Sequence, residues 1–148
     1  MDHEGAYKIL LVDNDLNCLD AVGQILKREG YEILPISDGY EAVKVITENR
    51  INLAIVDFDL VDTDGIQILY EIRKMRRNIP VVIMTAEPSN ERRLASLQAG
   101  AYSFVSKPIN IPSFRQIVAK AIEAPKLRTV EVERSLTFTR WIRWIIHR

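Results

Sequence analysis

Carboxylate, hydroxyl and ammonium side chains follow four of the short apolar runs along this chain. The residues concerned are Asp13, Asn14, Asp15, Asp57, Asp59, Thr85 and Lys107. If the apolar runs are strands of one parallel sheet, these side chains meet at the carboxyl edge of that sheet, which is where ligands bind in open α/β folds. We therefore examine first what chemistry such a group of residues can carry out.

The crowded carboxylates require a positive charge. Carboxylates placed close together repel and raise one another's pKa unless a cation neutralises them, and all-oxygen ligands suit Mg²⁺. With the cation in place, Asp57 could act as a nucleophile towards a phosphoryl donor and form an acyl phosphate. Lys107 and Thr85 could then hold the oxygens of the phosphoryl group.

The elements that must position these residues alternate between strand and helix patterns. The predicted strands are short apolar runs, and they lie at Lys8 to Val12, Glu32 to Ile36, Leu53 to Val56, Val81 to Met84 and Ser103 to Val105. The predicted helices between and after them lie at Leu16 to Glu29, Gly39 to Glu48, Gly65 to Met75, Glu91 to Gln98 and Ser113 to Ile122. Five βα units predict an α/β fold, a doubly wound three-layer sandwich around a parallel five-stranded sheet.

Residues at the ends of the helices support these boundaries. Asp38 and Asn90 are predicted N-caps, and Gly30 and Gly100 stand where helices should end. Asp62 and Asp64 precede Gly65 and are interpreted as turn residues.

Composition and charge divide the chain into two segments. Residues 125–148 hold six Lys or Arg against two Glu, which gives this tail a net charge of about +4 and the preceding 124 residues about −4. We predict one domain over residues 1–124 and a basic amphipathic extension over 125–148, too short for a DNA-binding output domain. The extension is expected to pack on the domain, a second subunit, a partner protein or a membrane surface, and nucleic acid is the least favoured of its partners.

Other features exclude several classes of protein. No apolar run is long enough to cross a membrane, and the first residues are polar, so we expect a cytoplasmic protein. Cys18 is the only cysteine, which excludes an internal disulfide. His3 and His147 have no ligand partner in the sequence and are not candidate phosphodonor or metal residues.

In the order and spacing of its motifs, the sequence resembles the response regulator receiver family of two-component signalling. The motifs are Asp13-Asn14-Asp15 after the first strand, Asp57 with Asp64-Gly65 following, Thr85-Ala86 after the fourth strand, and Gly100-Ala101 leading to Lys107-Pro108. The resemblance covers nearly all of residues 7–124 and implies a flavodoxin-like fold.

The resemblance also implies roles for these residues. Asp57 would be the phosphoacceptor, and Asp13, Asn14, Asp57 and the backbone carbonyl of Asp59 would bind Mg²⁺. Thr85 and Phe104 would be the switch residues, Lys107 would contact the phosphoryl group, and the peptide before Pro108 is often cis in this family. The donor would be the phosphohistidine of a sensor histidine kinase.

The resemblance further places the surface read by a downstream protein on the fourth and fifth helices and the fifth strand. Arg92, Arg93 and Arg115 are candidate contacts there, and a homodimer is a further arrangement.

Three positions bear on how this member would differ. Asn14 stands where most members have an acidic metal ligand, so Mg²⁺ should bind more weakly, and Asp15 could compensate in part through water. Asp59 and Glu87 stand where receivers carry residues that tune the dephosphorylation rate. Val61 replaces a common proline and should affect only loop stiffness.

Alternative functions follow from the same residues. Asp57-Phe-Asp59 resembles the nucleophile loop of haloacid dehalogenase-like phosphatases, but that family needs an acidic pair after its lysine, and this chain has no Asp beyond Asp64. A receiver-like binding module that signals without phosphate, suggested by Asn14, and a receiver fragment of a larger regulator stay open.

Overall fold

The computed structural model describes residues 5–75 and 78–124. Within these ranges the chain forms five strands and five helices that alternate along the sequence. The predicted amphipathic extension over residues 125–148, as well as His3 and His147, lies outside the described residues.

One parallel five-stranded sheet forms the middle layer, in the order β2-β1-β3-β4-β5. The strands span Lys8–Val12 (β1), Glu32–Ile36 (β2), Leu53–Asp57 (β3), Val81–Thr85 (β4) and Ser103–Ser106 (β5). Every residue of β3 and β4 is buried, which matches the apolar runs from which they were predicted. The order reverses between β1 and β3, so the topological switch point lies beside the end of β3.

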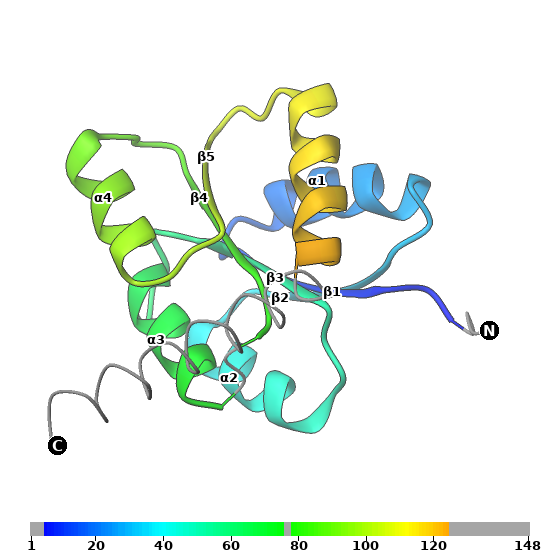
Figure 1. The fold of residues 1–148 in the computed structure, drawn as a ribbon, viewed down its shortest axis with the longest axis horizontal. Coiled ribbons are helices and arrows are strands. Elements are labelled where there is room, and N and C mark those ends of the chain that lie inside the picture. Colours follow the sequence, from blue (N-terminus) through cyan, green and yellow to red (C-terminus); the bar gives the residue numbers. More distant parts are fainter. Residues whose placement is uncertain (1–4, 76–77, 125–148) are drawn as a thin grey trace, which may run out of the picture.

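Helices cover both faces of this sheet (Figure 1). They span Leu16–Arg28 (α1), Gly39–Glu48 (α2), Gly65–Met75 (α3) and Asn90–Gln98 (α4), followed by an unlabelled helix over residues 111–124, yellow to orange in Figure 1. The α/β doubly wound sandwich predicted from the sequence is therefore confirmed.

Alternate strand residues feed two hydrophobic cores, one on each face. Ile9 and Leu11 of β1 pack with α1 and with Phe114 of the last helix. Leu10 and Val12 point to the other face, where they join side chains of α2 and α3. Because the central strands are apolar on both sides, their polar residues are confined to the carboxyl ends.

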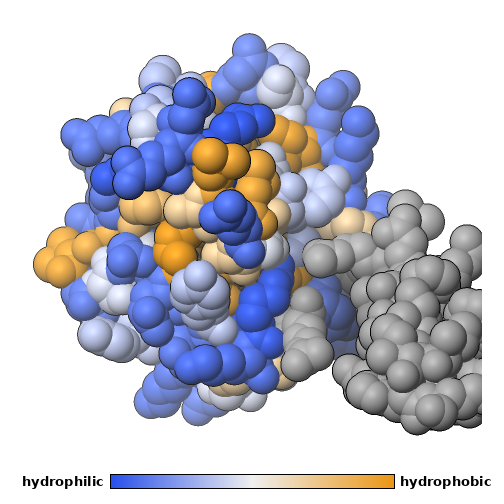
Figure 2. All heavy atoms as spheres, turned by 60° about the vertical axis from the view of Figure 1, so that its left-hand side comes forward, coloured by the Kyte–Doolittle hydropathy of each residue, from blue (hydrophilic) through white to orange (hydrophobic). Residues whose placement is uncertain are grey.

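The helix α4 is attached more lightly than the others. Its single buried residue is Ser96, and two of its leucines are exposed, Leu94 to 57% and Leu97 to 42%. Figure 2 shows the side of the molecule from which α4 comes forward, where apolar side chains interrupt a mostly hydrophilic surface. No helix in residues 5–75 and 78–124 has the length and apolarity to cross a membrane.

The predicted boundaries need small corrections. The N-cap of α4 is Ser89 rather than Asn90, since the Ser89 hydroxyl accepts the backbone N–H of Arg92. The last helix begins two residues before Ser113, because Asn110 caps it and Pro112 is tolerated in a first turn. Asp38 caps α2 as predicted. Gly30 and Gly100 follow their helices with φ of 92° and 102°, where glycine is favoured.

Candidate functional site

The sheet order brings the predicted polar residues to one place. The strand β3 lies between β1 and β4, so the residues that end or follow these three strands are neighbours at the carboxyl edge. Asp57 is the last residue of β3, and Asp13 directly follows β1. Thr85 ends β4, and its carbonyl accepts the backbone N–H of Lys107 at 2.8 Å, which fixes the chain beyond β5.

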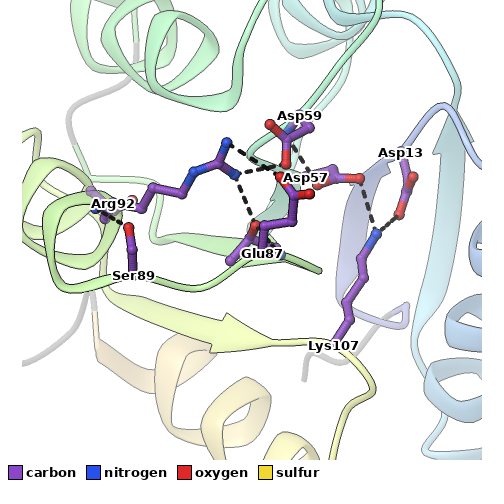
Figure 3. A network of polar contacts seen from close by, with 9 residues as sticks. Asp13, Asp57, Asp59, Glu87, Ser89, Arg92 and Lys107 are labelled. Atoms are coloured by element: carbon purple, nitrogen blue, oxygen red, sulfur yellow. Dashed lines mark hydrogen bonds and ion pairs between the residues drawn. The ribbon is translucent and has the colours of Figure 1, made fainter.

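Lys107 joins the two buried carboxylates (Figure 3). Its Nζ donates to Asp13 Oδ2 at 2.6 Å and to Asp57 Oδ2 at 2.9 Å. The side chains of Asp13 and Asp57 are only 1% and 9% exposed, and that of Lys107 is 17% exposed. We call Asp13, Asp57 and Lys107 the carboxylate site, and its members were all predicted from the sequence.

The two carboxylates of this site differ in their electrostatics. Burial works to raise the pKa of Asp13, but hydrogen bonds from Cys18, Lys107 and the Asp15 backbone outweigh it and hold this pKa below its usual value. For Asp57, burial prevails over the hydrogen bonds from Lys107 and the Asp59 N–H, and the charge of Asp13 adds to it, so the pKa is raised. Despite burial, the two carboxylates raise the pKa of Lys107, which stays charged.

The loop after Asp57 is folded tightly against the end of β3. The Asp59 N–H donates to Asp57 Oδ1 at 3.1 Å, and the Gly65 N–H donates to the Phe58 carbonyl at 2.8 Å. A Cβ on Gly65 would lie 2.6 Å from the Asp57 carbonyl oxygen, so only glycine fits here without displacing the backbone.

The two aspartates ahead of Gly65 act as local acceptors, as their interpretation as turn residues requires. Asp62 accepts the backbone N–H groups of Gly39 and Tyr40, and Asp64 accepts that of Gln67. These bonds tie the loop to the start of α2 and open α3.

The predicted switch residues lie on neighbouring strands. Thr85 is fully buried, and its hydroxyl oxygen accepts the Glu87 N–H at 3.0 Å and Arg92 Nη1 at 3.1 Å. Phe104 pairs with Ile83 across β4 and β5 and packs, partly buried, against the core. The Lys107–Pro108 peptide is cis, as the resemblance implies.

Asn14 and Asp15 are placed differently from the carboxylate site. Both residues are exposed. Asp15 is the N-cap of α1, and its Oδ1 accepts the backbone N–H groups of Asn17 and Cys18. The structure thus gives Asp15 a role in starting α1.

Two contacts of this region were not predicted. Arg92, expected on an outward surface, turns inward to Asp59 and Thr85. Its position in the first turn of α4, three residues after the Ser89 cap, was a signal for this, because side chains there lean towards the helix start. Cys18 lies against Asp13, and burial followed by this hydrogen bond raises the pKa of its thiol to about 11, so the thiol stays protonated.

The donor atoms fit a hard cation that keeps much of its water. Among the described residues there is no group of three or more acidic, thiol or imidazole side chains placed to hold a metal ion. The carboxylate site offers two carboxylates, whose charge is already compensated by the Lys107 ammonium. Mg²⁺ is typically bound by one or two carboxylates, with water and phosphate oxygens completing its shell, and this donor set agrees with that habit.

Comparison with known proteins identifies the family. The model of the response regulator receiver domain matches residues 9–131. The chain belongs to the response regulator receiver family. The receiver is 31% identical over 113 residues to the sporulation initiation phosphotransferase F of Bacillus subtilis, which covers 76% of this chain and 91% of that protein.

Longer relatives and solved structures agree with this. The receiver is 34% identical over 140 residues to the transcriptional regulatory protein GlrR of Escherichia coli K12, covering 95% of this chain but only 31% of that regulator. A CheY-like receiver domain from Methanospirillum hungatei superimposes with a TM-score of 0.79 at 30% identity, over 84% of this chain and 99% of that one. The chain thus spans about a third of the length of the first of these relatives.

Proposed function

We propose that this receiver takes a phosphoryl group on Asp57 from the phosphohistidine of a sensor histidine kinase. An oxygen of Asp57 attacks phosphorus, an O–P bond forms, the N–P bond breaks, and the imidazole keeps the electron pair. The observation that carries the proposal is the contact of the buried Asp57 carboxylate with Lys107 at the end of β3. A carboxylate held beside a fixed ammonium has a counter-charge for the phosphoryl oxygens already in place.

Each neighbour of Asp57 has a task in this reaction. Lys107 balances the charge of the phosphoryl group, which adds about −1.5 to −2 charges. The backbone N–H of Asp59 orients the Asp57 carboxylate. The raised pKa of Asp57 makes the carboxylate more basic, and hence a better nucleophile, than an ordinary aspartate.

Magnesium completes the proposed site. Asp13, Asn14, Asp57 and the backbone carbonyl of Asp59 would hold Mg²⁺, with Asn14 contributing an uncharged oxygen. When bound, the ion neutralises charge on the phosphoryl oxygens.

The signal would leave the site through Thr85 and Phe104. We propose that Thr85 moves towards the phosphoryl group and that Phe104 follows it, shifting α4, β5 and the helix over residues 111–124. A few kcal/mol of differential interaction is enough to invert the populations of two such states. A downstream protein would read this face through Arg93 and Arg115 together with the exposed leucines of α4.

The proposal is tested by the intact mass of the protein after incubation with acetyl phosphate and Mg²⁺. We expect one phosphoryl group on the wild type and none on Asp57→Asn, while Asp20→Asn, which removes an exposed aspartate of α1, behaves as the wild type. A wild type left unmodified by both acetyl phosphate and phosphoramidate would contradict the proposal and favour a module that signals without phosphate.

A further inference from the structure

A second cation lies beside the carboxylate site, on the side opposite Lys107 (Figure 3). The Nη1 of Arg92 donates to Asp59 Oδ2 at 2.7 Å and to Thr85 Oγ1 at 3.1 Å. The guanidinium carbon also lies 4.3 Å from the centre of the Phe58 ring. Arg92 therefore touches two residues of the loop after β3 and the residue that ends β4.

The backbone of Arg92 is fixed from both directions along α4. Its N–H donates to the Ser89 hydroxyl at 3.1 Å, and its carbonyl accepts the Ser96 hydroxyl at 2.8 Å. The planar guanidinium, supported on an aromatic face, presents its donors in a fixed fork, which a flexible lysine does not reproduce. The inward position of this side chain is thus held by several independent contacts.

The charges of the region fall into an inner and an outer set. Lys107 pairs with the inner carboxylates, Asp13 and Asp57. Arg92 pairs with what we call the outer carboxylates, Asp59 at 2.7 Å and Glu87 at 3.9 Å, which are 50% and 79% exposed. The hydrogen bond to Asp59 raises the pKa of Arg92, which keeps its charge.

The outer carboxylates lie where an anionic phosphodonor meets the protein. They are more exposed than Asp57, so a donor that approaches Asp57 from solvent passes near them. Two uncompensated carboxylates would repel such a donor, because repulsion between like charges is strong at separations shorter than the Debye length of about 10 Å at 0.1 M salt.

We infer that Arg92 is a positioning residue for the phosphorylation of Asp57, because its guanidinium neutralises Asp59 and Glu87 and so admits a dianionic donor. The inference rests on the proposed function. It assigns to α4 a part in the phosphorylation step itself, in addition to any part in passing the signal on.

The test is the rate of phosphorylation by acetyl phosphate at fixed Mg²⁺, followed by intact mass. At low ionic strength, Arg92→Gln should lower kcat/KM by about 5- to 20-fold, mainly through KM, and the loss should shrink at about 0.5 M salt. Arg92→Lys should restore most of the rate. The matched control is Arg50→Gln, which removes an exposed arginine at the opposite edge of the sheet, before β3 begins, and should leave the rate unchanged.

A double variant separates charge from structure. Asp59→Asn/Arg92→Gln has the net charge of the wild type and should recover to within about threefold of its rate. If Arg92→Gln does not fold, this double variant and Arg92→Lys decide, and a tenfold loss in either would overturn the inference.

The two proposals fail in different ways. A wild type that takes no phosphoryl group overturns the proposed function and the inference with it. A wild type that is phosphorylated, while Arg92→Gln reacts equally fast or loses the same factor at all salt concentrations, overturns the inference alone.

Discussion

Replacing Lys107 by methionine tests how strongly the carboxylate site depends on its ammonium. Lys107→Met keeps an unbranched side chain of similar length but removes the charge that lies 2.6 Å from Asp13 and 2.9 Å from Asp57. Because these carboxylates are 1% and 9% exposed, water has little access to replace the ammonium. The variant therefore leaves two facing carboxylates buried without a counter-charge.

The expected loss of stability follows from that burial. Removing one partner of a buried ion pair costs about 3 to 5 kcal/mol. Lys107 serves two carboxylates, which favours the upper end, but one carboxylate can bind a proton and relieve the repulsion. We therefore expect the free energy of unfolding to fall by about 3 to 4 kcal/mol near neutral pH in the absence of divalent cations.

The pH dependence distinguishes this origin from a packing defect. In the wild type the lowered pKa of Asp13 contributes stability above the usual carboxyl pKa, and this is lost as pH falls through the lowered value. The raised pKa of Lys107 contributes below the usual lysine pKa, and this is lost as pH rises through the raised value. In Lys107→Met a carboxyl pKa is raised instead, so the deficit should shrink as pH falls through that raised pKa.

Urea unfolding of four proteins at a series of pH values measures this, namely the wild type, Lys107→Met, Asp57→Asn and the double variant. Asp57→Asn alone should be at least as stable as the wild type, because burial and the charge of Asp13 raise the pKa of Asp57. It should also recover part of the loss in Lys107→Met. A loss in Lys107→Met below about 1 kcal/mol, as for exposed pairs, or one that is the same at every pH, would refute the reasoning.

The remaining predictions concern the loop, the metal and the helix cap. Gly65→Ala should cost about 1 to 3 kcal/mol in thermal or urea unfolding, because its Cβ meets the Asp57 carbonyl, whereas Gly23→Ala, with open space in mid-helix, should stabilise. Asn14→Asp should lower the Mg²⁺ concentration at which acetyl phosphate modifies the protein, and an unchanged magnesium midpoint would contradict a ligand role. Ser89→Ala should cost about 1 kcal/mol of unfolding free energy and Asn90→Ala much less, since Ser89 is the cap; equal losses would speak against this assignment.

The strands and most of the carboxylate site could be predicted because their signals are local. Buried parallel strands appear as apolar runs, and a polar residue at the end of such a run must lie at the carboxyl edge, as Asp13, Asp57 and Lys107 do. The predicted strands ended one residue early at Asp57 and Thr85, because pairing with a neighbouring strand continues through residues that are not apolar.

The contacts that were missed depend on side-chain direction. The sequence shows that Arg92 follows Thr85 by seven residues, but not that its side chain crosses to Asp59 and covers Phe58. Likewise Ser89 and Asn90 are both good cap residues, and which one caps α4 depends on where the chain leaves β4. Such choices depend on tertiary packing that a single sequence does not display.

The most direct test of the account is to locate the phosphoryl group itself. Acyl phosphates are reduced by borohydride, which converts a modified aspartate to homoserine, and tandem mass spectrometry of the digested protein then identifies the position. After reaction with acetyl phosphate and Mg²⁺, the account predicts homoserine at position 57 alone. Homoserine at position 13 or 59, or a phosphoryl group that resists borohydride on another residue, would contradict it.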